Sequence, residues 1–227
     1  MQPTSTIPSI RTDNPDFENH IVMWMEKFGR QIQATRDLPD CELLFAGDSI
    51  TEHWPYEDYA ADIWEEYYGI RKVINAGSGG DCTEHILWRL ENGIMEHIRP
   101  ALVVLLAGTN NTGRRMEPPE DICAGIQAII DCVLRYSPNS KILLHAIFPR
   151  GHDANDPERQ INEAASPLLK HLADTYAQVE FLNINDVFLG ADEILSEDIM
   201  PDLLHPGREG YRLWAEAIEP YVANVLR

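Results

Sequence analysis

Three short apolar segments of this chain end in a small residue next to a hydrogen-bonding group. Gly-Asp-Ser follows the first segment and carries the hydroxyl of Ser49, Gly-Gly-Asp follows the second and offers the backbone N–H of Gly80, and Gly-Thr-Asn follows the third and carries the amide of Asn110. Acyl transfer needs an attacking oxygen and hydrogen-bond donors aimed at the developing oxyanion. The three segment ends therefore predict an acyl-transfer site, provided that they meet in the fold.

A general base can come from the C-terminal region. Asp202 and His205 stand three residues apart, a spacing at which a carboxylate and an imidazole can meet across one turn. Asp202 can then fix the tautomer of the ring, which leaves the other ring nitrogen to take the proton of Ser49. The order Ser, Asp, His is that of α/β-hydrolases, but Ser49 does not stand in a G-x-S-x-G motif, so that fold is not indicated.

Each of these residues also has an ordinary structural interpretation. Ser49 can cap a helix, Asn110 can belong to a turn, and Gly-Gly-Asp is frequent in tight turns. Asp202 and His205 can share a loop hydrogen bond without any catalytic role. Only the combination of these residues favours chemistry.

The elements that must position these residues alternate between strand and helix. Apolar runs predict strands, and apolar positions recurring at three- and four-residue steps predict helices. The strands are expected at about 41–47, 72–76, 101–107, 141–147 and 178–184, and the helices at about 15–36 (with Asn14 as N-cap and Pro15 at N1), 57–66, 83–97, 119–136, 156–177 and 208–226.

This alternation predicts an α/β fold with three layers, α/β/α, around a five-stranded parallel sheet. The favoured strand order is the flavodoxin-like 2-1-3-4-5, which places the exits of the first three strands side by side at one edge. No shift in composition divides the chain. We therefore expect an N-terminal arm over residues 1–14 and a single domain over residues 15–227.

The composition narrows the classes of partner. The 227 residues carry a formal net charge of −19, which argues against a nucleic-acid backbone or an anionic membrane as the main partner. No run approaches the ~18 apolar residues of a membrane span, and the first residues do not read as a signal peptide. The expected location is cytoplasmic. The four cysteines form no C-x-x-C pair, so neither a metal nor another cofactor is predicted.

Taken together, the motifs resemble those of the SGNH (GDSL-type) hydrolase family over residues 41–213. Gly-Asp-Ser-Ile at Ser49 matches the family's first block, Gly-Gly-Asp at Gly80 the second, Gly-Thr-Asn-Asn at Asn110 the third, and Asp-x-x-His at His205 the last. The segments 75–93 and 148–151 are similar to the branch of intracellular platelet-activating-factor acetylhydrolase catalytic subunits.

The resemblance implies a role for each motif residue. Ser49 is implied as nucleophile, His205 as base and Asp202 as the residue that orients the base. The implied oxyanion hole consists of the backbone N–H groups of Ser49 and Gly80 and the side chain of Asn110.

Two positions qualify the resemblance. The glycine of the second block is doubled, so Gly79 is an alternative to Gly80. The wider family usually has Asp after the Asn of the third block, whereas this chain has Asn111, as in the acetylhydrolase-like branch.

The function implied is a two-step hydrolysis of a small-molecule ester with a short acyl group, chiefly acetyl. A carbohydrate O-acetyl esterase is the alternative within the same class. A non-catalytic module that binds a protein partner on a hydrolase scaffold is the alternative from another class, and the resemblance also allows a homodimer.

The residues that contact the substrate are harder to predict from sequence. The candidates are Asp48, Trp54, Arg150 and His152, from segments expected near the strand exits. The competing interpretation is that the aromatic residues pack onto the sheet and the basic residues are surface charges with local partners.

Overall fold

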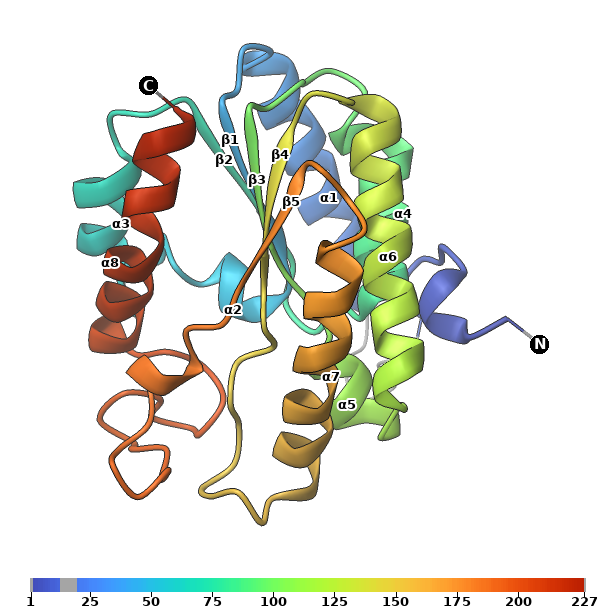
Figure 1. Cartoon of the computed structure of the whole chain (residues 1–227). Coiled ribbons are helices and arrows are strands. Elements are labelled where there is room, and N and C mark those ends of the chain that lie inside the picture. The colour runs from blue at the N-terminus through green and yellow to red at the C-terminus, as the bar shows by residue number, and fades with distance from the viewer. Residues whose placement is uncertain (1, 13–19, 227) are drawn as a thin grey trace.

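A five-stranded parallel sheet forms the centre of the molecule (Figure 1). The computed structural model describes residues 2–12 and 20–226, so the predicted helix start at Asn14 and Pro15 lies outside the described residues. The strand order is β2-β1-β3-β4-β5, which confirms the predicted order. The strands are β1 (Leu43–Gly47), β2 (Val73–Gly77), β3 (Leu102–Leu106), β4 (Lys141–His145) and β5 (Val179–Leu182).

The apolar runs of the central strands are buried on both faces of the sheet. In β1, Leu43 and Phe45 contribute to one hydrophobic cluster and Leu44 and Ala46 to the other. Alternation with a period of two sends successive side chains to opposite faces. A strand covered on both faces has no polar face to show, which explains why its sequence reads as a continuous apolar run.

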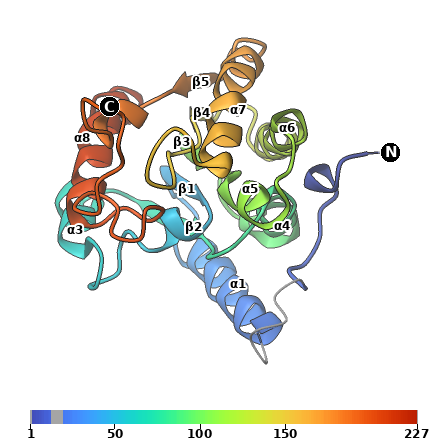
Figure 2. The same cartoon turned by 90° about the horizontal axis from the view of Figure 1, so that it is seen from below.

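Helices cover both faces of this sheet, as Figures 1 and 2 show. One face packs against α1, α4, α6 and α7, and the other against α3 and α8. Within the described ranges, no helix has both the length and the apolarity needed to cross a membrane. The α-helices are α1 (His20–Asp37), α2 (Ser49–Glu52), α3 (Ala61–Tyr68), α4 (Thr83–Arg89), α5 (Thr109–Arg115), α6 (Pro119–Tyr136), α7 (Pro157–Ala173) and α8 (Arg208–Val225).

The sequence did not predict every helix correctly. The short helices α2 and α5 were not expected, because four and seven residues are too few to show a helical period. The helix expected over 83–97 stops at Arg89 and continues as a π-helical segment over Leu90–Ile94. Gly93 has a φ of 151°, and a Cβ there would lie 2.7 Å from Cδ1 of Ile32 on α1. Gly93 thus ends the helical segment that follows α4 and leaves room for α1 to pack closely against it.

The N-terminal arm lies along α4 and α6 over the part that the structure describes (Figure 2). Ser5 is buried and donates its hydroxyl to the carbonyl oxygen of Asp121 at 2.6 Å. The hydroxyl of Thr83 donates to the carbonyl oxygen of Ser5 at 3.1 Å, and the N–H of Ser9 donates to that of Glu84 at 3.3 Å. The arm is therefore held at the N-terminal ends of both helices.

Candidate active site

Ser49 stands at the carboxyl end of β1, on the first residue of α2. A Cβ at Gly47 would lie 2.6 Å from the carbonyl oxygen of Leu106, so only glycine allows this tight exit. The cap of α2 is Asp48, whose carboxylate accepts the N–H of Ile50 at 3.0 Å. The capping role that sequence left open for Ser49 thus belongs to its neighbour, and the hydroxyl of Ser49 is available for another contact.

That contact is with His205. The Oγ of Ser49 lies 2.8 Å from Nε2 of His205, and Nδ1 of the same ring lies 2.6 Å from Oδ2 of Asp202. The other oxygen of Asp202 accepts the backbone N–H groups of Leu204 at 3.1 Å and His205 at 2.7 Å. These bonds hold the loop in one conformation and the ring in line between the carboxylate and the hydroxyl.

Asp202 remains ionised in this arrangement. Partial burial acts to raise the pKa of its carboxyl, but the hydrogen bonds donated by the backbone and ring of His205 outweigh that effect and hold the pKa below its usual value. A carboxylate facing Nδ1 favours the tautomer that carries its proton there. The lone pair of Nε2 then points to the hydroxyl of Ser49, which is the geometry of a general base.

The loop over residues 78–82, which connects β2 to α4, contains both candidate glycines, Gly79 and Gly80. The N–H of Gly79 donates to Oε2 of Glu52 at 2.5 Å. Glu52 also accepts from Nζ of Lys27 at 2.7 Å and from the hydroxyl of Tyr56 at 2.6 Å. Because the Gly79 amide is already engaged, the geometry favours Gly80 as the oxyanion donor.

The two asparagines at the exit of β3 have different surroundings. Asn110 is half-buried, and its Nδ2 donates to the carbonyl oxygen of Asp81 at 3.1 Å, which aligns the amide beside the loop. Asn111 is fully buried, accepts the N–H of Thr83 at 3.0 Å and donates to Glu117 at 2.9 Å. Asn111 therefore joins α5 to the start of α4.

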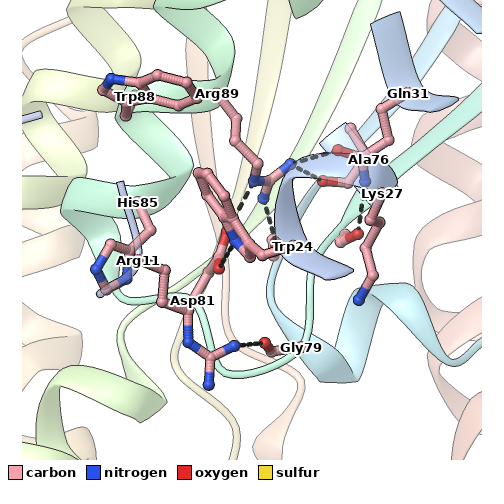
Figure 3. A network of polar contacts seen from close by, with 12 residues as sticks. Arg11, Trp24, Lys27, Gln31, Ala76, Gly79, Asp81, His85, Trp88 and Arg89 are labelled. Atoms are coloured by element: carbon pink, nitrogen blue, oxygen red, sulfur yellow. Dashed lines mark hydrogen bonds and ion pairs between the residues drawn. The ribbon is translucent and has the colours of Figure 1, made fainter. Parts of the chain in front are cut away.

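A buried arginine ties the strand exits to the loop (Figure 3). Arg89 is only 1% exposed and donates from Nε to Asp81 at 2.7 Å. Its other nitrogens donate to the carbonyl oxygens of Ala76 at 2.7 Å and Gly47 at 3.2 Å. The indole N–H of Trp24 on α1 donates to the second oxygen of Asp81 at 2.8 Å. The exits of β1 and β2 and the loop thus share one polar anchor.

The structure argues against two of the predicted substrate contacts. Trp54 is 0% exposed, and its ring centroid lies 4.3 Å from that of Trp214 and 5.6 Å from that of Phe45. The side chain belongs to the core between β1 and α8. Asp48 is also completely buried, because its carboxylate is the cap of α2. Neither side chain is exposed to solvent in this structure.

The other two candidates stay predictions. Arg150 donates a hydrogen bond to the carbonyl oxygen of Thr109 at 2.9 Å and forms a salt bridge with Glu158 at 2.5 Å, so its guanidinium already has local partners. The side chain of His152 is 63% exposed and lies 3.3 Å from the carboxylate of Asp153.

A second histidine, His53, which was not among the predicted site residues, lies beside His205. The ring centroid of His53 is 5.2 Å from that of His205 and 4.5 Å from that of Tyr59, on which it stacks. Burial lowers the pKa of His53, and the neighbouring His205 lowers it further. The feature of the sequence that could have identified His53 is its four-residue spacing from Ser49, which places both residues on one side of a helical turn.

One buried cluster in the described part of the chain has the atom types of a metal site. Ligand atoms of Cys82, Glu84 and His85 lie within 4.8 Å of one another. However, Glu84 pairs with Arg115 at 2.7 Å, and Nδ1 of His85 accepts the N–H of Cys82 at 3.0 Å. A guanidinium in contact with the cluster opposes a cation there, so we assign no metal to it.

Several cavities in the described part of the chain lie away from the contact between Ser49 and His205. One of about 660 Å³ is at the amino ends of β3 and β4, lined by residues such as Pro100, Tyr136 and Lys141. Another of about 250 Å³ lies beside α2, lined by residues that include Lys27 and Glu52. The first is at the wrong edge of the sheet for the chemistry, because ligand sites form at the carboxyl ends of parallel strands.

Comparisons with solved structures show the same fold. A GDSL-like lipase from Bacteroides thetaiotaomicron superposes with a TM-score of 0.71 at 18% identity, covering 88% of this chain and 97% of that one. A carbohydrate acetylesterase from Sinorhizobium meliloti superposes with a TM-score of 0.61 at 23% identity, covering 81% and 99%.

Sequence comparisons give the family. Human platelet-activating factor acetylhydrolase IB subunit alpha1 is 33% identical over 203 residues, which cover 89% of this chain and 84% of that protein. The rat alpha2 subunit is also 33% identical over 203 residues, covering 89% and 85%. The model of the GDSL-like lipase/acylhydrolase family matches residues 45–213. This chain therefore belongs to the GDSL-like lipase/acylhydrolase family and is a carboxylic ester hydrolase of the acetylhydrolase-like SGNH type.

Proposed function

We propose that this enzyme hydrolyses short-chain esters, chiefly acetyl esters, through an acyl-enzyme formed on Ser49. The observation that carries the proposal is the continuous contact from Ser49 through His205 to Asp202, with distances of 2.8 and 2.6 Å. A serine that served only as a cap or a surface hydroxyl would have no need of an aligned imidazole and carboxylate.

In the first step, Nε2 of His205 takes the proton of Ser49 as Oγ attacks the ester carbonyl. Asp202 stabilises the imidazolium that forms. The oxyanion develops beside the N–H groups of Ser49 and Gly80 and the amide of Asn110. His205 then gives the proton to the departing alcohol, and the acyl group remains on Ser49.

In the second step, His205 takes a proton from water, and the water oxygen attacks the acyl carbonyl. The same donors stabilise the second oxyanion. When that intermediate collapses, the bond to Oγ breaks, His205 returns the proton to Ser49, and the acid departs. No step needs a metal or an organic cofactor.

The acetyl preference is supported by the relatives at 33% identity, whose names are those of acetylhydrolases. The carbohydrate acetylesterase shares the fold at 23% identity, which leaves sugar acetates as a second substrate class to test. A panel of p-nitrophenyl esters of increasing acyl length, together with acetylated sugars, separates these possibilities.

The decisive variant is Ser49→Ala. We expect it to abolish hydrolysis of p-nitrophenyl acetate, whereas Ser166→Ala on α7, which has no part in the mechanism, keeps wild-type turnover. A fluorophosphonate should label the wild type on Ser49 and leave Ser49→Ala unlabelled. Retained turnover in Ser49→Ala, or a folded wild type that resists labelling, contradicts the proposal and favours a binding role.

A further inference from the structure

The peptide between Gly79 and Gly80 is held from outside its own loop. The guanidinium of Arg11, on the N-terminal arm, donates a hydrogen bond to the carbonyl oxygen of Gly79 (Figure 3). On the other side of the same residue, the N–H of Gly79 donates to Glu52 on α2. A cation and an anion from distant segments thus fix both polar groups of Gly79.

The contact from Arg11 also determines the direction of the next amide. The peptide is planar and trans, so the C=O of Gly79 and the N–H of Gly80 belong to one rigid unit and point in opposite directions. When Arg11 holds the carbonyl toward the arm, the N–H of Gly80 must point away from the arm. Ser49 lies close to Gly79, since a Cβ on Gly79 would be 3.7 Å from Cβ of Ser49.

This peptide needs an outside contact because its own residues do not restrict it. Two successive glycines lack the Cβ that excludes most backbone conformations, and Gly80 has a φ of 75°. A rotated peptide would turn the Gly80 N–H away from the oxyanion. Arg11 lies so close that a Cβ on Gly80 would come within 2.7 Å of its Cζ. The missing side chain of Gly80 therefore leaves the space that the guanidinium of Arg11 occupies.

The arm is anchored so that Arg11 reaches this position. Six residues before Arg11, Ser5 is fixed between Asp121 and Thr83, and two residues before it, Ser9 is bound to Glu84. The arm lies outside residues 45–213, which the family model matches. The contact with Gly79 thus joins the hydrolase motifs to a segment that the family model does not cover.

We propose that Arg11 is a positioning residue of the reaction, which locks the Gly79–Gly80 peptide so that the N–H of Gly80 faces the oxyanion. The N-terminal arm is then part of the active site. This inference rests on the proposed esterase function. Because the oxyanion forms only along the reaction, loss of Arg11 should lower kcat and leave KM nearly unchanged.

The kinetic test compares Arg11→Ala with the wild type on p-nitrophenyl acetate. We expect kcat to fall about tenfold, less than the 10²–10³ typical when an oxyanion donor is removed, because the donor is misdirected and not lost. Millimolar guanidinium should restore part of the rate in Arg11→Ala and none in Ser49→Ala. Arg135→Ala, which removes an exposed arginine of α6, is the matched control and should keep the wild-type kcat.

A second test observes the peptide itself and does not depend on activity. Gly79–Gly80 is the one Gly-Gly step in the sequence, so glycine labelled with ¹³C at its carbonyl and with ¹⁵N gives a single HNCO correlation, from the Gly80 amide to the Gly79 carbonyl. We expect that correlation to be a single sharp signal in the wild type. It should shift and broaden in Arg11→Ala and return toward the original position with guanidinium.

The outcomes separate the two proposals. A wild type without esterase activity contradicts the proposed function, and the HNCO signal still decides whether Arg11 orders the peptide. An active wild type with an unchanged kcat in Arg11→Ala, or an unchanged HNCO signal, overturns the role of Arg11. If Arg11→Ala does not fold, Arg11→Lys provides the same comparison, since an ammonium keeps the charge but loses the planar shape of the guanidinium.

Discussion

Asn110 and Asn111 are neighbouring identical side chains with different surroundings. Asn110 is half-buried beside the loop over residues 78–82, whereas Asn111 is fully buried with its oxygen and nitrogen both bonded. The resemblance to the SGNH family had already assigned the oxyanion role to Asn110. The structure adds an argument against the same role for Asn111, since its amide is fully buried and already bonded to protein partners.

We predict opposite phenotypes for the two alanine variants. Asn110→Ala should lower kcat by about 10²–10³ with little change in the free energy of unfolding, because one oxyanion donor is lost. Asn111→Ala should instead lower that free energy by about 1–3 kcal/mol, because it leaves buried partners unsatisfied. Esterase assays and urea unfolding of both variants provide the measurement.

If Asn110→Ala unfolds more easily than Asn111→Ala and keeps its turnover, the roles proposed for the two side chains are reversed.

At the scale of elements, the site depends on how α2 is seated on the sheet. Trp54 follows α2 directly and packs between β1 and α8. The hydroxyl of Tyr211 on α8 donates to the carbonyl oxygen of Ile50 on α2 at 2.8 Å. A four-residue helix cannot be stable by itself, so these contacts hold Ser49 in place.

Trp54→Ala is therefore predicted to act on stability and not on substrate binding. A large buried aromatic residue replaced by alanine costs about 3–5 kcal/mol, which urea unfolding would detect. The fraction that stays folded should keep the wild-type KM. Ile70→Ala, at an exposed apolar position, is the control and should cost little.

A raised KM for p-nitrophenyl acetate in Trp54→Ala, together with unfolding like that of the wild type, would instead indicate that Trp54 contacts the substrate.

At the scale of the whole molecule, one buried histidine couples folding to pH. His145, at the end of β4, is fully enclosed, and its Nε2 accepts the indole N–H of Trp214 on α8 at 3.1 Å. Burial lowers the pKa of His145 to about 3. The folded state therefore keeps this ring neutral at pH values where the unfolded chain would protonate it.

The sign of the effect follows from proton binding. Between the ordinary histidine value near 6.5 and about 3, the unfolded state binds one more proton than the folded state, so stability falls as the pH falls. We predict that His145→Gln, which keeps an acceptor for Trp214 but cannot titrate, shows a weaker loss of stability between pH 6.5 and pH 4. Urea unfolding at several pH values measures both slopes.

His171→Gln, at an exposed position on α7, is the control and should retain the wild-type slope. An identical slope in the wild type and His145→Gln would show that His145 does not contribute to acid unfolding.

The sequence by itself determined the fold class and the motifs on which the proposed chemistry rests. Apolar runs that alternate with amphipathic helices predicted the parallel sheet, because both signals are local and repeat along the chain. The strand order followed from the flavodoxin-like topology that such an alternation favours. Gly-Asp-Ser, Gly-Thr-Asn and Asp-x-x-His were recognisable as short motifs. Their geometry in the structure, with Ser49, His205 and Asp202 in line, is what the proposed mechanism uses.

Only the tertiary structure decided what surrounds that chemistry. Apolar character did not say whether Trp54 lies in the core or in a pocket, since both environments accept an indole. The resemblance implied Gly80 and left Gly79 as the alternative, and only the structure showed that the Gly79 amide already donates to Glu52. Arg11 and Gly79 are 68 residues apart, and a single contact across that separation leaves no periodic pattern in the sequence. Such contacts depend on how elements pack, which local residue patterns do not encode.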